Sequence, residues 1–376
     1  MKIVFAGGGS GGHFYPIIAV VEELNRLIDQ EKLIGVNLYY FSSDPFDKRL
    51  LFENGVSFEK VESGKLRRYF SIWNFFDLFK IAFGILRALW KIYRLYPDVV
   101  FSKGGYASFP TLLAAKLLAI PVIIHESDSI PGRTNKWASR FAARVAISFA
   151  EAGKYFPDEK VAITGVPIRR ALLSTISFGA REYLKLNSDA PLILILGGSQ
   201  GAQNINDTVL DILPQLVAKY QIIHQAGKNN FAEVKNRAEV ILSRNPEKDR
   251  YKCYEFLNEA ALRMSAGVSE LVISRAGSTI FEIAQWGIPA ILIPLATASE
   301  DHQRKNAFAY ARTGAAEVLE ENNLTPHILL SEIDRLMQNE PLKEEMRGKA
   351  KSFAKPEAAK KIAREIINIA LTHEGN

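Results

Sequence analysis

The chain has 376 residues, of which 48 % are apolar and 23 % are charged, a balance typical of a folded protein long enough for two domains. Its single cysteine, Cys253, excludes a disulfide within the chain, so we expect a reducing compartment. We see neither a signal peptide nor a transmembrane helix. The net charge of +6 favours an anionic partner, and nucleic acid, phosphorylated substrates and acidic lipid all remain open on charge alone.

Short β-branched or aromatic runs alternate with longer helical patterns along the chain. KIVFA (2–6) predicts a buried parallel strand, and FYPIIAVVEELNRLI (14–28) predicts a helix after it. A second cycle starts at PLILILGGSQG (191–201), which precedes a predicted helix from Ala202 to about Lys219. Further strands are predicted for NLYYFS, DVVFS, PVIIHE, RVAIS, KVAITG, QIIHQ, LVISRAG and PAILIP. This alternation requires a parallel sheet covered on both faces, and we expect one such sheet in each half.

Three glycine-rich turns follow predicted strands, at 7–12, 103–105 and 197–201. A turn that leaves a parallel strand lies at the carboxyl edge of the sheet, and glycine followed by a helix N-terminus suits a phosphate. The first turn also matches the dinucleotide fingerprint, but the nearest acidic residue, Asp44, comes too late to hold a ribose. Each turn, taken alone, could have a purely structural role as a tight turn. Together they favour a cleft that holds several phosphates, as in a two-domain enzyme with one phosphorylated substrate on each side.

His13 follows the first turn directly. A lone histidine there is most often a capping or packing residue. A helix N-terminus disfavours the imidazolium form, however, so the ring would stay neutral and could take a proton from a hydroxyl. We favour the general base.

The stretch SRAGSTIFE (274–282) has two interpretations. Glu282 falls three residues after Thr279, which is the spacing of a capping box, and a carboxylate there could also bind the hydroxyls of a ribose. Downstream, Gln303 and Asn306 could bind sugar hydroxyls or cover a helix face. We find no metal-ligating pattern and no nucleophile motif.

These motifs, taken together, resemble the MurG family of bacterial UDP-N-acetylglucosamine transferases. The resemblance rests on GGGSGGHFYP, SKGGYASFP, IIHESDSIPGRTNK, GVPIR, GGSQGAQNIN, HQAGK, SRAGSTIFE and the Q-x-x-N of HQRKNA, which occur in the family's order. It implies an α/β chain with a GT-B fold, in which two Rossmann-like parallel-sheet domains face a cleft. We expect residues 1–164, joined by a C-terminal helix at 355–376, to form the acceptor domain, and 165–354 to form the donor domain.

The resemblance also implies an inverting, metal-independent transfer of GlcNAc from UDP-GlcNAc to the 4-hydroxyl of the MurNAc of lipid I, which gives lipid II. It implies no cofactor, and it makes His13 the base. The donor-binding residues it implies are Ser10, Gly11, Gly12, Asp128, Arg169, Ser199, Gln200, Leu257, Ser278, Thr279, Ile280, Glu282 and Gln303. The acceptor-binding residues it implies are Gly104, Gly105, Tyr106 and Glu126. Ser10 stands where the family usually has Thr, and Asp128 where many members have Asn.

A basic, aromatic segment spans 65–94 and holds seven Lys or Arg but one acidic residue, Asp77. Much of 81–93 can be a core helix with a solvated basic face. Around 67–80 we favour docking to an anionic membrane surface, on the cytoplasmic side. The residues predicted to dock are Arg67, Arg68, Trp73, Phe75, Phe76, Phe79 and Lys80. Nucleic acid is not expected, because no recognised binding module accompanies the charge.

Two alternatives to this function remain from the residues alone. One is a related GT-B transferase that glycosylates another membrane lipid such as diacylglycerol. The other is a nucleotide-sugar-binding protein without catalysis, which should lack the base that His13 provides.

Overall fold

The computed structural model describes residues 1–64, 73–186, 189–198 and 201–374, with only the backbone for 73–79, 299 and 374. The chain divides into two compact units. Unit 1 comprises Met1–Arg170 and Lys355–Asn376, and unit 2 comprises Ala171–Ala354.

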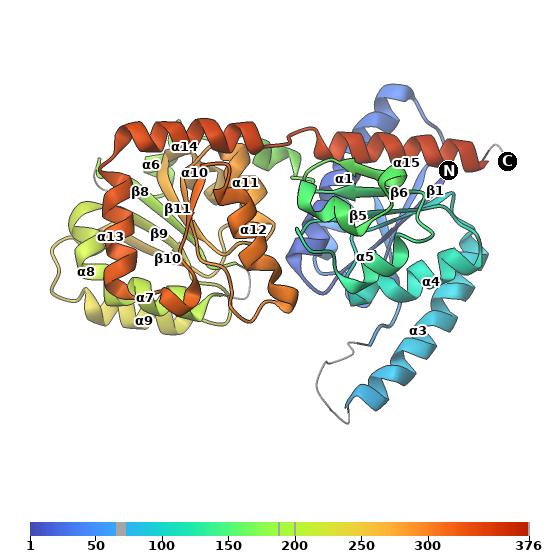
Figure 1. Cartoon of the computed structure of the whole chain (residues 1–376), viewed down its shortest axis with the longest axis horizontal. Coiled ribbons are helices and arrows are strands. Elements are labelled where there is room, and N and C mark those ends of the chain that lie inside the picture. Colours follow the sequence, from blue (N-terminus) through green and yellow to red (C-terminus); the bar gives the residue numbers. More distant parts are fainter. Residues whose placement is uncertain (65–72, 187–188, 199–200, 375–376) are drawn as a thin grey trace. The chain divides into compact units, whose positions relative to one another are not determined.

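Unit 1 is built on a seven-stranded parallel sheet in the order β3-β2-β1-β4-β5-β6-β7 (Figure 1). Its strands are β1 (Lys2–Ala6), β2 (Asn37–Ser42), β3 (Val56–Lys60), β4 (Val99–Ser102), β5 (Val122–Glu126), β6 (Arg144–Ile147) and β7 (Val161–Ile163). Its main helices are α1 (Gly11–Glu31), α2 (Lys48–Glu53), α3 (Trp73–Leu95), α4 (Phe109–Leu117), α5 (Arg133–Ala138) and α15 (Ala358–Glu374). The strand order reverses between β1 and β4, which is where ligands bind in open α/β sheets.

Alternate residues of β1 enter the two hydrophobic layers of unit 1. Ile3 and Phe5 pack against α1 and α15, whereas Val4 and Ala6 pack towards α3 and α4. The C-terminal helix α15 belongs to unit 1 because it buries one continuous stripe there. That stripe consists of Ile362, Ala363, Ile366, Ile367 and Ala370.

Unit 2 is built on a six-stranded parallel sheet in the order β10-β9-β8-β11-β12-β13. Its strands are β8 (Leu192–Leu196), β9 (Gln221–Gln225), β10 (Tyr251–Tyr254), β11 (Ser269–Ser274), β12 (Ala290–Leu292) and β13 (Ala316–Val318). Its helices are α6 (Ala180–Tyr183), α7 (Gln203–Asp211), α8 (Leu213–Lys219), α9 (Phe231–Ile241), α10 (Glu259–Val268), α11 (Thr279–Trp286), α12 (His302–Ala311), α13 (Pro326–Met337) and α14 (Glu340–Phe353). The prediction of two Rossmann-like parallel-sheet domains is confirmed.

One predicted helix is two helices in the structure. We expected a single helix from Ala202 to about Lys219, but α7 ends at Asp211 and α8 begins at Leu213. Pro214 has no N–H to donate to a helical carbonyl, so the continuous helix breaks just before it. Within the described ranges, no helix is both long and apolar enough to cross a bilayer.

The helix α3 lies so close to the segment that follows β3 that only glycine fits at position 84. A Cβ on Gly84 would lie 1.8 Å from the carbonyl oxygen of Glu62. We expect Gly84→Ala to lower the free energy of unfolding by about 1–3 kcal/mol, because α3 must move to admit the methyl group. Scanning calorimetry of the purified protein measures the effect.

Gly348 provides a matched control, since it also lies within a helix, α14, and a Cβ there would meet nothing within 4 Å. Gly348→Ala should therefore leave the stability unchanged or raise it by up to about 1 kcal/mol. If Gly84→Ala changed the stability no more than Gly348→Ala does, the close approach of α3 to the Glu62 carbonyl would be contradicted.

Candidate active site

Two glycine-rich loops leave neighbouring strands of unit 1 side by side. β1 and β4 pair in parallel with Ala6 opposite Ser102, and the N–H of Lys103 donates to the carbonyl of Ala6 at 3.0 Å. The first loop runs into α1, and the second runs through Gly104 and Gly105 into a short helical turn, Tyr106–Ser108. The structure therefore brings the two predicted loops together at the switch point of the sheet.

The second loop needs its glycines. Gly104 and Gly105 have φ of 80° and 81°, a backbone conformation that side chains disfavour. A Cβ on Gly104 would lie 2.7 Å from the Asn135 amide, and one on Gly105 would lie 3.1 Å from Cε1 of His13. The loops also touch through Tyr106, whose ring lies 2.9 Å from where a Cβ of Gly9 would be. The loop backbone thus comes directly against the imidazole.

His13 lies in the first turn of α1, and its partly buried ring has Nδ1 3.1 Å from the hydroxyl of Ser10. The pKa of His13 is lowered from 6.5 to about 4, mainly by burial and also by the charge of Lys103. Asp128 and a hydrogen bond with the Gly8 backbone act in the opposite direction. The imidazole is therefore neutral at pH 7. The main cause is burial, whereas the sequence suggested the helix N-terminus.

Glu126, which we predicted to bind the acceptor, has both carboxylate oxygens engaged within the chain. Its Oε1 accepts the Asp128 N–H at 3.0 Å, and its Oε2 accepts the Gly132 N–H at 3.0 Å and the Asn135 amide at 2.9 Å. Burial raises the pKa of Glu126. These bonds fold the loop 127–132 around the carboxylate, so the geometry makes Glu126 an organiser of that loop.

Arg169 lies at the N-terminal end of α1. Its guanidinium stands 4.8 Å over the ring of Tyr15, and Tyr15 packs edge-on against Phe46. A Cβ on Gly11 would lie 3.1 Å from the Tyr15 ring, whereas Gly12 is exposed. Ser10, Gly11, Gly12, His13 and Arg169 therefore share one region of unit 1.

Of the other predicted donor residues, Asp128 lies in unit 1, in the loop after β5. The rest belong to unit 2, where they come after strands of its sheet. The N–H of Leu257 donates to Gln225 Oε1 at 3.0 Å, and the Leu257 side chain is buried, so only its backbone can face a ligand. The amide oxygen of Gln303 accepts the Leu295 N–H at 3.0 Å, which fixes the orientation of that side chain. Ser199 and Gln200 lie outside the described residues.

The start of α11 differs from the predicted capping box. Ser278 is the N-cap and makes no side-chain capping bond, and Thr279 is the first helical residue. Glu282 is therefore in the fourth helical position, not the third that a capping box requires. The side chain of Ile280 is fully buried, so that residue can offer a ligand only its backbone.

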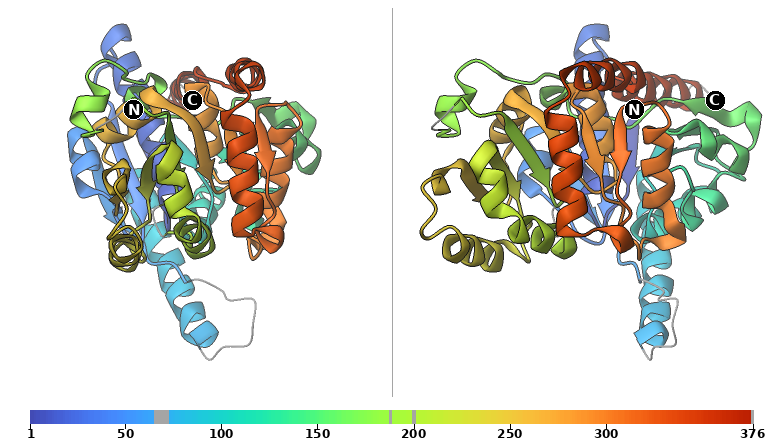
Figure 2. Two further views of the ribbon diagram at one scale, coloured as in Figure 1. Left: turned by 90° about the vertical axis from the view of Figure 1, so that its left-hand side faces the viewer. Right: turned by 60° about the vertical axis from the view of Figure 1, so that its left-hand side comes forward.

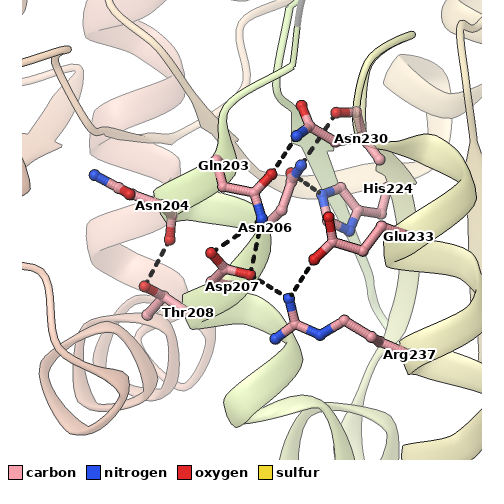
Figure 3. Close-up of polar contacts among 10 residues, drawn as sticks. Gln203, Asn204, Asn206, Asp207, Thr208, His224, Asn230, Glu233 and Arg237 are labelled. Carbon is pink, nitrogen blue, oxygen red and sulfur yellow. Dashed lines mark hydrogen bonds and ion pairs between the residues drawn. The ribbon is translucent and has the colours of Figure 1, made fainter.

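Sequence reasoning missed a polar network that fixes α7, the helix after the third glycine turn (Figure 3). Asn206 on α7 binds His224 on β9 through its Oδ1, at 3.0 Å, and donates to the carbonyl of Ala226 at 3.1 Å. Asp207 pairs with Arg237 on α9 at 2.5 Å. The only sequence signal was a histidine in the predicted strand QIIHQ.

A second missed cluster ties together the loops that leave β11, β12 and β13. Arg275 donates to the carbonyl of Ile293 at 3.1 Å and pairs with Glu321 at 2.5 Å. Glu321 also accepts the amide of Asn204 on α7 and the N–H of Ala296, both at 2.9 Å. Burial acts to raise the pKa of Glu321, but the hydrogen bond from Ala296 and the charge of Arg275 outweigh it and lower the pKa. The ion pair and hydrogen bonds of Arg275 and Glu321 therefore hold together the loops at the carboxyl edge of this sheet.

Comparison with known proteins agrees with this architecture. Residues 3–147 match the glycosyltransferase family 28 N-terminal domain, and residues 192–362 match the C-terminal domain of the same family. A UDP-N-acetylglucosamine–N-acetylmuramyl-(pentapeptide) pyrophosphoryl-undecaprenol N-acetylglucosamine transferase 2 of Bacillus cereus is 39 % identical over 340 residues, which cover 90 % of this chain and 92 % of the relative. The crystal structure of Acinetobacter baumannii MurG is similar with a TM-score of 0.73 and 28 % identity, and the match covers 98 % of this chain and 99 % of that one.

The chain belongs to the MurG family. A Clostridium perfringens transferase of the same name, without the final numeral, is 38 % identical and covers 90 % of both chains. The MurG-family motifs follow the carboxyl ends of strands in both units: His13 comes after β1, the GGY turn after β4 and the HESDS loop after β5. In unit 2, Leu257 follows β10 and the RAGST turn follows β11. Ligands bind at this edge in open parallel sheets, so the placement agrees with a substrate site in each unit.

Proposed function

We propose that this chain transfers GlcNAc from UDP-GlcNAc to the 4-hydroxyl of the MurNAc of lipid I, which yields lipid II and UDP. The observation that carries the proposal is a neutral imidazole, His13, held at the meeting point of two glycine-rich loops. Membership of the MurG family supports the choice of donor and acceptor, because the relatives' names state this reaction.

The transfer proceeds as a single displacement with inversion. His13 takes the proton of the acceptor hydroxyl as its oxygen attacks the anomeric carbon. The bond from that carbon to the diphosphate oxygen breaks, and UDP leaves with the electron pair. The guanidinium of Arg169 offers positive charge to the leaving diphosphate, so we propose that no metal ion is needed.

Donor and acceptor are assigned to different units. We place the acceptor at the two loops of unit 1, with Gly104, Gly105 and Tyr106. We place the uridine and the donor sugar on unit 2, where the Leu257 backbone reads uracil, Glu282 binds the ribose and Gln303 contacts the sugar.

A direct assay tests the proposal. Purified protein, UDP-GlcNAc and lipid I should give the disaccharide product, with a β-anomeric linkage by NMR and with undiminished activity in EDTA. Transfer to diacylglycerol instead would favour the alternative lipid transferase. UDP-GlcNAc binding without turnover would favour a binding protein.

We further propose that the protein docks on the cytoplasmic face of the cell membrane through α3. Phe83, Leu86, Trp90 and Tyr93 repeat at helical spacing and are each more than half exposed. Figure 2 shows the N-terminal half of α3 extending away from the sheet of unit 1. Exposed aromatic residues beside cations suit a headgroup region, and the Arg94 guanidinium lies 4.8 Å over the Trp90 ring.

The structure changes one expectation about this segment. We expected much of 81–93 to be a core helix with a solvated basic face, and Ala88 and Ile92 are indeed fully buried. The opposite face, however, is an apolar row rather than a basic one. Lys80 is exposed, Arg67 and Arg68 lie outside the described residues, and only the backbone is described at Trp73, Phe75, Phe76 and Phe79.

We expect the double variant Phe83→Glu/Trp90→Glu to bind anionic vesicles at least about tenfold more weakly, because two carboxylates replace apolar contacts and repel the lipid charge. Vesicle co-sedimentation measures the binding. Phe178→Glu is the matched control, since Phe178 is an almost fully exposed aromatic residue of unit 2. Equal losses in both proteins would argue against docking by α3.

A further inference from the structure

Lys103 is a buried lysine that the proposed mechanism does not use. It follows β4 directly, and only 3 % of its surface is exposed. Burial of an ammonium group costs free energy unless partners compensate for the lost water. Its Nζ donates to the hydroxyl of Ser127, and the carboxylates of Glu126 and Asp128 lie close enough for their charges to favour the ammonium form.

The lysine is a direct neighbour of His13. A Cβ built on Gly7 would lie 3.4 Å from Cβ of Lys103 and 4.0 Å from Cβ of His13, so the two side chains flank a residue that has none. Gly105, two residues after Lys103, contacts the far edge of the imidazole. Lys103 and Gly105 therefore both approach His13 from the loop that follows β4.

Charged and titratable groups from several elements lie in this region of unit 1. They are Lys103 after β4, Glu126 at the end of β5, Asp128 after β5, Tyr106 beside Gly9, Tyr15 beside Gly11, and Arg169 over Tyr15. Among them, Lys103 and Asp128 act on the imidazole with opposite signs. The carboxylate of Asp128 favours the protonated ring, and the ammonium of Lys103 opposes it.

We propose that Lys103 is a positioning residue of the transfer, whose buried ammonium offsets the charge of Asp128 and so keeps the His13 ring unprotonated and ready to accept a proton. The inference rests on the proposed function, in which His13 is the base. A neutral residue at position 103 would leave the Asp128 carboxylate without compensation. The ring would then take up a proton at a higher pH than in the wild type, and the base would be lost from that pH downwards.

NMR titration of the histidine ring tests the inference without relying on turnover. The His13 signal is assigned by its loss in His13→Gln, and the full chain is titrated from pH 5 to pH 8. In the wild type the ring should stay neutral throughout. In Lys103→Met we expect the His13 titration to move up by about one pH unit or more, into this window, because a nearby cation has been removed.

The rate profile should follow the ring. The acid limb of kcat/KM should move up with the titration, so that Lys103→Met loses at least about 2-fold between pH 7.5 and pH 5.0, where the wild type loses almost nothing. Lys103→Arg, which keeps the charge, should restore the wild-type profile. Adding Asp128→Asn to Lys103→Met should bring the His13 titration back down.

Lys343→Met is the matched control, because Lys343 is equally buried but pairs with Glu270 and Glu340 in unit 2. It should lower stability and leave the His13 titration unmoved. If Lys103→Met does not fold, Lys103→Gln keeps a donor for Ser127 without the charge. A folded neutral variant with an unmoved His13 titration overturns the inference. A moved titration with an unmoved acid limb overturns His13 as the base, and with it the role of Lys103 in the transfer, although the charge effect of Lys103 on the ring would stand.

Discussion

His13→Ala should lower turnover by about 100-fold or more, the usual worth of a general base, while UDP-GlcNAc still binds. The substitution removes the group that we propose takes the proton, whereas the uridine and ribose contacts are assigned to unit 2. Steady-state kinetics with lipid I measures the first effect, and calorimetric titration with UDP-GlcNAc measures the second.

Ser10→Ala tests how much turnover depends on the hydroxyl beside the His13 ring rather than on the ring itself. The Ser10 hydroxyl lies 3.1 Å from Nδ1 of His13, so its loss should disturb the ring without removing it, and we expect a fall of about tenfold or less. Unchanged turnover in His13→Ala would remove His13 from its role. Loss of UDP-GlcNAc binding together with turnover would point to disruption of the fold.

The buried centre of each sheet was predictable because its strands are continuous apolar runs. β1, β4, β5 and β8 are buried along nearly their whole length, which produces the runs KIVFA, VVFS, VIIHE and LILIL. The edge strands β3, β10 and β13 were not predicted. They are only partly buried, so their sequences VSFEK, YKCY and AEV carry polar residues and lack a clear apolar signal.

The site was predictable where function depends on local sequence. Glycine turns and a histidine at a helix start can be recognised without knowing the strand order. The partners of Glu126, Lys103 and Asn206 could not be found in that way, because each contact joins residues of different elements or loops that only the fold brings together. Even the neutral state of His13 was predicted for the wrong reason, since burial depends on which loops the topology brings over the ring.

Two other histidines are fully buried and are neutral in the folded protein. His125 on β5 has Nε2 2.9 Å from the carbonyl of Gly165, so that nitrogen carries the proton. His224 on β9 donates from Nε2 to Asn206 Oδ1, which leaves Nδ1 to accept from the hydroxyl of Tyr251 at 2.9 Å. Burial lowers the pKa of His125 well below 6.5 and that of His224 to about 3.

These two histidines should make the fold less stable in mild acid. Below about pH 6.5 the unfolded chain binds protons on both rings and the folded chain does not, so stability falls as the pH falls towards the folded-state values. Each ring should cost about 1.4 kcal/mol of unfolding free energy at pH 5.5 relative to pH 7.5. Urea denaturation at the two pH values measures this difference in unfolding free energy.

His224→Gln should be less stable than the wild type at pH 7.5, yet its unfolding free energy should change less between the two pH values, by about 1.4 kcal/mol. His327→Gln, at an exposed position on α13, should keep the wild-type difference. An equal difference in all three proteins would mean that His224 takes up a proton without unfolding, and hence that its two hydrogen bonds do not hold the ring neutral.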